Sequence, residues 1–245
     1  MHGSRLRTLS ALTAVTLTAG YALAAFVAPM DADQGFMQKI FYLHVPMAIV
    51  ALCGFVFGGI CAVAHLRTGD SRWDLRAYVA IHQSLILGAG VLLTGSIWAR
   101  ASWGHWWVWD EPTLVSFLII FLLYATYTPL RFSIEDREKQ ARYASVFAIT
   151  AGAFVPLNFM AVRAATSLVH PRTFDSADNL PGAMRSAFLV CLLGMALLYV
   201  TLWKYEMASK HTTAQLRALK RKLTADTDPH APRSRRSAAP ELQVR

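Results

Sequence analysis

Charged residues are scarce in this chain. Only 16% of its 245 residues are Asp, Glu, Lys or Arg, whereas 55% are hydrophobic, and the mean hydropathy is +0.36. A disordered chain needs much charge and little hydrophobicity, so this composition excludes one. Uncharged apolar runs of near-membrane length also exclude a water-soluble enzyme with one compact core. The composition is that of a membrane protein.

Cysteine is even rarer, and three common motifs are missing. Cys53, Cys61 and Cys191 each stand in an apolar stretch, and none forms a C-x-x-C pair or a C-x-x-C-H haem-attachment motif. Thiol redox chemistry and covalent haem are therefore excluded, and we expect the three to be buried as small apolar residues. No G-x-x-x-x-G-K-[ST] sequence occurs, so any ATP hydrolysis coupled to this protein must come from another chain.

What the chain has instead is a set of long apolar stretches. A hydrocarbon core about 30 Å thick requires roughly 20 apolar residues of helix. Six stretches meet this requirement, and they make up about half of the chain: residues 9–28, 43–64, 77–98, 113–130, 144–162 and 183–203. The first is longer than the apolar core of a signal peptide, so we expect it to be retained. The prediction is an all-α polytopic protein with six transmembrane helices.

The positions of the basic residues predict the orientation. Six spans place both termini on one side, and most of the 24 lysines and arginines fall on that side, which the positive-inside rule makes cytoplasmic. The net charge of +9 therefore reflects topology, and we expect no nucleic-acid partner. We expect residues 1–203 to form the membrane domain. Residues 204–245 form a basic cytoplasmic tail, partly disordered, facing anionic lipid.

The predicted outward segments are short (29–42, 99–112 and 163–182), but the middle one is unusual. It reads SWGHWWVWDEP over residues 102–112 and holds four of the seven tryptophans: Trp103, Trp106, Trp107 and Trp109. Such residues either anchor helix ends at the headgroups or form a platform for a flat apolar ligand, which Gly104 would let approach closely. In a shallow helix, the i, i+3 and i, i+4 spacings would join the four indoles into one wall.

Two further outward segments carry histidine. His44 lies in FYLHVP, where Pro46 suits a first helical turn, and His170 lies in SLVHP. Each alone is typical of a hydrogen-bonded polar tip at the interface. Together with an aromatic platform they suggest non-covalent haem b, because haem iron accepts an imidazole on each face and the macrocycle needs aromatic contact.

Nearby polar residues fit more than one interpretation. Haem propionates need cations, which three arginines could supply, although they also suit helix-end anchors: Arg100, Arg163 and Arg172. His105 is a competing ligand, while His82 fits a hydrogen bond to a neighbouring helix. Asp110 and Glu111 either favour the positive N-terminus of the following helix or shape the ligand loop.

The segment WGHWWVWD resembles the tryptophan-rich WWD signature of haem-handling membrane proteins, and the six-span layout resembles the haem exporter protein C (CcmC) family of system I cytochrome c maturation. The other matching segments are FYLHVP over residues 41–46 and VPLNF from residue 155 through Val162 and Arg163 to His170 and Pro171. The resemblance extends to about Lys204. Two positions depart from it: Glu111-Pro112-Thr113-Leu114 replaces the family's Ala-Arg-Leu-Thr, and His105 replaces a small polar residue.

The resemblance implies a haem-delivery protein of the inner membrane, not a catalyst. It implies that His44 and His170 are the axial iron ligands and that the WWD segment holds the haem edge, which points to Trp103, Gly104, Trp106, Trp107, Trp109 and Asp110. Haem would be presented on the outer, periplasmic face and loaded onto the chaperone CcmE. The implied partners are the ATPase CcmA with CcmB, and the small subunit CcmD.

Three other functions compete with this one. A cytochrome c haem lyase or synthetase of the CcmF or CcsA type generally has more spans or large outer domains, for which 245 residues leave no room. A b-haem electron-transfer subunit normally holds its histidines inside the spans, where only His82 fits. A scaffold subunit of a transporter would tolerate replacement of the four loop tryptophans.

Overall fold

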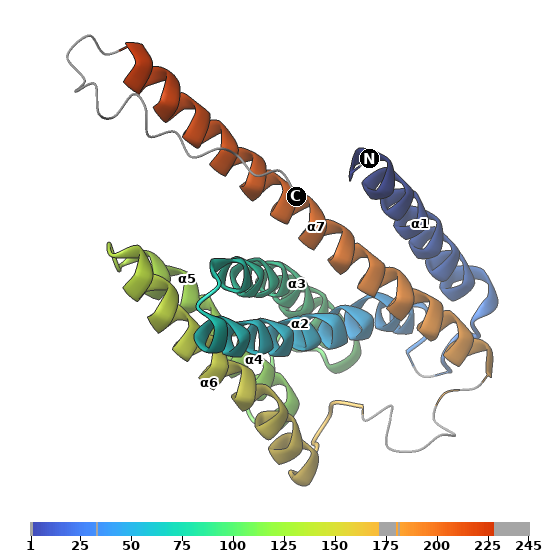
Figure 1. Cartoon of the computed structure of the whole chain (residues 1–245). Helices are drawn as coiled ribbons and strands as arrows, with labels where there is room; N and C mark the ends of the chain where they lie inside the picture. The colour runs from blue at the N-terminus through green and yellow to red at the C-terminus, as the bar shows by residue number, and fades with distance from the viewer. Residues whose placement is uncertain (1, 33, 172–179, 181, 228–245) are drawn as a thin grey trace. The chain divides into compact units, whose positions relative to one another are not determined.

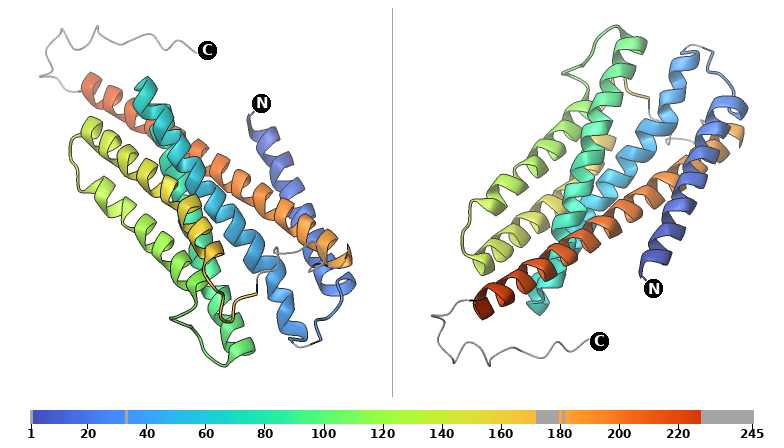
Figure 2. Two further views of the ribbon diagram at one scale, coloured as in Figure 1. Left: turned by 90° about the horizontal axis from the view of Figure 1, so that it is seen from below. Right: turned by 90° about the horizontal axis from the view of Figure 1, so that it is seen from above.

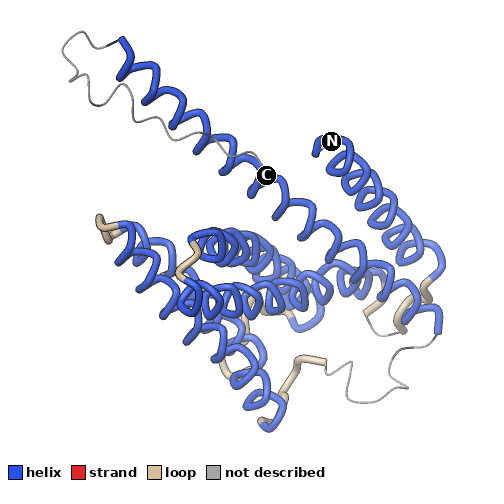
Figure 3. The backbone as a smooth tube through the Cα atoms, in the orientation of Figure 1, coloured by secondary structure: helices blue, strands red, loops and turns tan. Residues whose placement is uncertain are grey.

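The computed structural model describes residues 2–32, 34–171, 180 and 182–227. Within these ranges every regular element is a helix, and the one β-bridge, between Asp31 and Gly35, is isolated (Figure 3). The chain divides into two compact units, Met1–Lys204 and Tyr205–Arg245.

The helices succeed one another along the chain (Figure 1). Their bounds are α1 (His2–Ala22), the π-helical η1 (Leu23–Val27), the 3-10 helix η2 (Phe36–Ile40), α2 (Phe41–Thr68), α3 (Ser71–Trp103), α4 (Pro112–Ala125), α5 (Tyr127–Phe132), α6 (Arg137–Ala164) and α7 (Gly182–Thr227). In the described part of the chain, six helical stretches are long and apolar enough to cross a membrane, and each overlaps one of the six predicted spans. The six-span prediction is confirmed.

Carboxylate side chains mark where three of these helices begin. Asp70 accepts the N–H of Arg72 at the start of α3, and Asp136 accepts the N–H groups of Glu138 and Lys139 at the start of α6. Glu111 caps α4 in the same way. Each carboxylate satisfies N–H groups that lack a partner inside the helix and places negative charge at its positive end.

One detail of α2 differs from expectation. Because α2 begins at Phe41, Pro46 lies inside the helix rather than in its first turn. Proline has no N–H, so the carbonyl of Tyr42 lacks its usual partner four residues on. The irregularity lies in the same turn as His44.

The packing centres on α2 (Figure 2). One core cluster joins it to α3, α4, α5 and α6, a second joins it to α3 and α7, and a third joins it to η1 and α7. In the first cluster the ring of Tyr124 in α4 stacks on Phe55 of α2 at 3.9 Å, and its hydroxyl donates to the Phe55 carbonyl. Of the cysteines, Cys61 and Cys191 are buried as expected, but Cys53 is exposed.

A buried ion pair joins α3 to α5. The guanidinium of Arg131 donates to both carboxylate oxygens of Asp74, at 2.7 and 2.6 Å. Arg131 also donates to the hydroxyl of Tyr127, and it lies 5.2 Å from the ring centre of Tyr78. A bidentate pair of this kind fixes the relative register of the two helices.

Breaking that pair should be costly. In Asp74→Asn the Arg131 charge stays buried without its counter-ion, so we expect the unfolding free energy in detergent to fall by about 3–5 kcal/mol. Arg72→Gln is the matched control, because it breaks the surface pair with Asp70, in which the Arg72 side chain is 76% exposed. That change should leave the unfolding free energy close to that of the wild type. Similar losses in the two variants would contradict the assignment.

Candidate functional site

A pocket of about 740 Å³ lies at the end of the bundle where the three predicted outward segments meet. All three contribute lining residues, for example Gln34, Trp107 and His170. The pocket also reaches down among the helices, where Leu52 of α2 and Ile120 of α4 line it. Its volume falls in the range of sites that hold drug-sized ligands and small cofactors.

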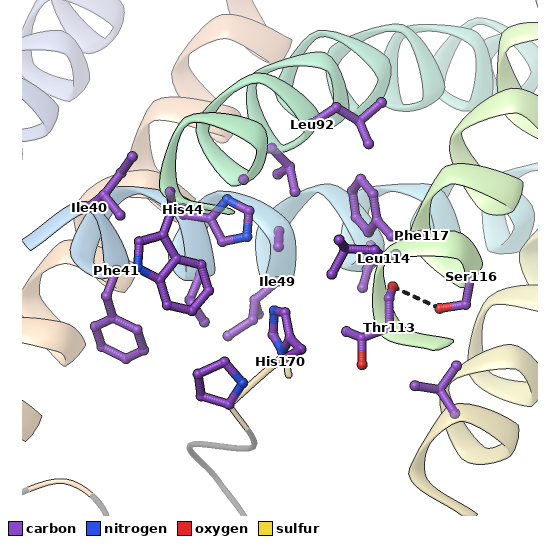
Figure 4. Close-up of a pocket in the computed structure, with 18 of the residues that line it drawn as sticks. Ile40, Phe41, His44, Ile49, Leu92, Thr113, Leu114, Ser116, Phe117 and His170 are labelled. Atoms are coloured by element: carbon purple, nitrogen blue, oxygen red, sulfur yellow. Dashed lines mark hydrogen bonds between the residues drawn. The ribbon is translucent and has the colours of Figure 1, made fainter. Parts of the chain in front are cut away.

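His44 projects from the first turn of α2 into this pocket (Figure 4). Its Nδ1 lies 2.9 Å from the hydroxyl of Thr94 in α3, and that hydroxyl donates its own hydrogen to the carbonyl of Gly90 at 2.8 Å. The Thr94 oxygen must therefore accept from His44, so the ring proton is on Nδ1. This tautomer leaves the lone pair on Nε2, as a metal-binding imidazole requires.

Gly95 makes room for the same ring. A Cβ atom built on Gly95 would lie only 2.9 Å from Cε1 of His44. Real Cβ contacts are not that short, so any larger residue would displace the imidazole. Thr94 and Gly95 thus fix both the tautomer of His44 and its position against α3.

His170 reaches the pocket from the segment after α6. Its ring packs edge-on against two indoles of α3, with centroids 5.9 Å from Trp98 and 6.4 Å from Trp103. Thr94, which contacts His44, and Trp98, which contacts His170, are four residues apart in α3. The two imidazoles therefore contact the same face of α3, at positions about 6 Å apart along its axis. Figure 4 shows both histidines bordering the same space.

The tryptophan segment is not the shallow helix that the spacing suggested. The α3 helix ends at Trp103, and Gly104 takes a left-handed conformation (φ 78°) that closes it, with its N–H bonded to the carbonyl of Arg100. Residues 104–111 are irregular, so the four indoles do not form one wall. Trp103 and Trp107 line the pocket, whereas Trp106 and Trp109 are 61% and 74% exposed.

Trp98 completes the aromatic side of the pocket, and the sequence reasoning missed it. It lies 5.2 Å from Trp103, and its Nε1 donates to Gln34 of the first outward segment at 2.9 Å. Tryptophan at the end of a span is also typical of an interfacial anchor. No local spacing joins Trp98 to Trp103, because residues five apart on a helix do not share a face.

The candidate polar residues divide between the pocket and its surroundings. Arg163 lines the pocket, whereas Arg100 donates to the carbonyl of Gly104 and so acts at the end of α3. Arg172 lies outside the described residues. Asp110 and His105 are exposed and do not line the pocket, and His82 stacks on Tyr78 elsewhere in α3.

Glu111 takes both roles that the sequence left open. It caps α4, and it also binds the segment that carries His170. The Glu111 side chain is fully buried. Its Oε2 accepts three consecutive backbone N–H groups, those of Leu168 (2.9 Å), Val169 (2.8 Å) and His170 (3.2 Å). Burial alone would raise the pKa of this carboxyl, but these N–H groups and that of Thr113 lower it to about 2. Glu111 is therefore ionised.

The comparison with known proteins can now be set beside this geometry. A sequence model described as heme exporter protein C matches residues 1–222. The chain belongs to this family. It is 34% identical over 219 residues to the heme exporter protein C of Bradyrhizobium diazoefficiens, covering 86% of this chain and 80% of that one. The Escherichia coli K12 protein is 30% identical over 199 residues, or 79% and 78% of the two chains.

A third relative matches a similar length of the chain. The heme exporter protein C of Rhodobacter capsulatus is 27% identical over 215 residues, which is 86% of this chain and 88% of the relative. The family membership and the six apolar helices identify a multi-pass membrane component of haem export and cytochrome c biogenesis. The exporter name describes a transport role rather than catalysis.

The ionised state of Glu111 predicts a pH dependence of stability. A folded-state pKa of about 2, below the ordinary 4.5, stabilises the fold above pH 4.5, and the stabilisation disappears as the pH falls toward 2. We expect Glu111→Gln to unfold more easily than the wild type by up to about 3 kcal/mol above that window. Unfolding in detergent across a pH series should show that the difference in unfolding free energy between the two proteins becomes smaller in acid. A difference that does not change with pH would contradict the assignment.

Proposed function

We propose that this chain binds haem b non-covalently in the pocket, with His44 and His170 as the axial ligands of the iron. The observation that carries the proposal is the convergence of two imidazoles, 126 positions apart in the sequence, on one face of α3. Imidazole on each face is an established form of haem ligation, and the macrocycle itself supplies the other four ligands.

The surroundings fit a flat apolar ligand with an anionic edge. Trp98, Trp103 and Trp107 supply indole surface, and the floor among α2, α4 and α6 is apolar. Arg163 provides a cation at the pocket for a propionate, and we assign the same role to Arg172. The exposed residues Trp106, Trp109 and Asp110, with Gly104 and the nearby Arg100, would contact the part of the haem that projects from the pocket.

The biological role that follows is delivery of haem. We propose that the chain presents haem to the chaperone CcmE, on which the covalent bond forms, and that it works with CcmA, CcmB and CcmD. Family membership supports this assignment. The residues of this chain then bind and orient the haem, and the bond-forming group belongs to the partner.

The orientation completes the proposal. We place both termini in the cytoplasm and the pocket at the periplasmic face of the inner membrane, because Arg67, Arg72 and Arg137 lie at the ends of α2, α3 and α6 opposite those that line the pocket. A green fluorescent protein fused to the C-terminus, which fluoresces only when cytoplasmic, should be bright. A dark fusion that is nevertheless produced at full length would reverse the topology.

The central test uses three histidine variants. The purified wild type should carry haem with a low-spin, six-coordinate spectrum, whereas His44→Ala and His170→Ala should lose that spectrum and most of their haem. Co-expressed with CcmE, the same variants should leave the chaperone without covalent haem. His105→Ala is the matched control, since His105 lies in the tryptophan segment outside the pocket and should change neither result. Unchanged haem in both alanine variants of the pocket would refute the proposal.

A further inference from the structure

Glu111 is an unusual helix cap. Asp70 and Asp136 cap α3 and α6 with side chains at the surface. Their carboxylates accept from N–H groups in the first turn of the helix that each one caps. Glu111 has no exposed surface, and most of its hydrogen bonds go to a segment more than 50 residues away. Burying a carboxylate is costly, so capping α4 does not by itself account for it.

The contacts of Glu111 surround the backbone next to His170. Three successive N–H groups converge on Oε2, which is the arrangement of a backbone nest around an anion. The N–H of His170 is one of the three. The hydroxyl of Ser167 lies 3.3 Å from Oε1 and 2.7 Å from the carbonyl of His170, which closes the turn on itself.

We propose that Glu111 is the positioning residue for His170. Its carboxylate folds residues 167–170 into a fixed turn, and that turn holds the imidazole against Trp98 and Trp103 at the pocket. The proposal rests on the function proposed above, because it takes His170 to be an iron ligand. It adds that a residue outside the pocket lining determines whether His170 can reach the iron.

The same contacts connect two parts of the site. Glu111 follows directly on the tryptophan segment that Trp107 and Trp109 belong to, and it is bonded to the turn that carries His170. Displacement of the tryptophan segment would therefore also displace His170. His44 is held differently, by contacts with Thr94 and Gly95 of α3.

The first experiment needs no haem. Amide hydrogen exchange of the full-length chain in detergent would be followed by mass spectrometry in the wild type and Glu111→Gln, where an amide NH₂ replaces one acceptor oxygen. Peptides covering residues 167–170 should exchange about tenfold faster in Glu111→Gln, because their N–H groups lose a charged acceptor. Asp136→Asn, which removes the charge of the side chain that caps α6, should leave these peptides at the wild-type rate. Wild-type exchange in Glu111→Gln would overturn the proposal.

The second experiment examines the iron. Glu111→Gln keeps the His170 side chain, so it should retain part of its haem, with a high-spin, five-coordinate fraction, and added imidazole should restore the low-spin spectrum. Asp136→Asn should remain low-spin, which separates loss of positioning from loss of charge at a helix cap. A fully low-spin Glu111→Gln, beside a His170→Ala variant that is altered, would refute the positioning role and leave the haem function standing. An unaltered His170→Ala would instead refute the ligand assignment.

A milder variant guards against misfolding. Glu111→Asp keeps the charge but shortens the side chain by one methylene, so it should show the same changes to a smaller degree. If Glu111→Gln cannot be purified, Glu111→Asp is the deciding variant. Faster exchange at residues 167–170 supports the proposal. Wild-type exchange together with a wild-type spectrum overturns it.

Discussion

The pocket depends on one buried carboxylate. Glu111 brings together the end of the tryptophan segment, the start of α4 and the turn that carries His170. Its cost of burial is offset only because four backbone N–H groups surround it. Removal of the carboxylate would leave those N–H groups without this acceptor.

The α3 helix supplies the frame on which both histidines are placed. Thr94 and Gly95 hold His44, and one turn further on Trp98, with Trp103, holds His170. At its opposite end Asp74 is bonded to Arg131, which fixes α3 against the α4–α5 pair. The geometry of the pocket is thus secured at both ends of a single long helix.

The sequence predicted the architecture well, and the contacts within the site less well. Span number follows from apolar length, and the choice of His44 and His170 follows from their place in predicted outward segments, which do meet at one pocket. Thr94, Gly95 and Trp98 were not foreseen because their roles arise from contacts between helices, which no local pattern encodes. The helical expectation for the tryptophan segment was wrong because Gly104 terminates α3.

The length of α3 has a mechanical consequence. Its 33 residues extend about 50 Å, roughly 20 Å more than the hydrocarbon thickness, and a typical tilt of about 20° absorbs little of the excess. The surplus turns must therefore stand clear of the acyl chains. Because Trp98 and Trp103 lie on this rigid helix, the distance between their indoles stays constant when the surrounding lipid fluctuates. The same side chains on a flexible loop would change their separation.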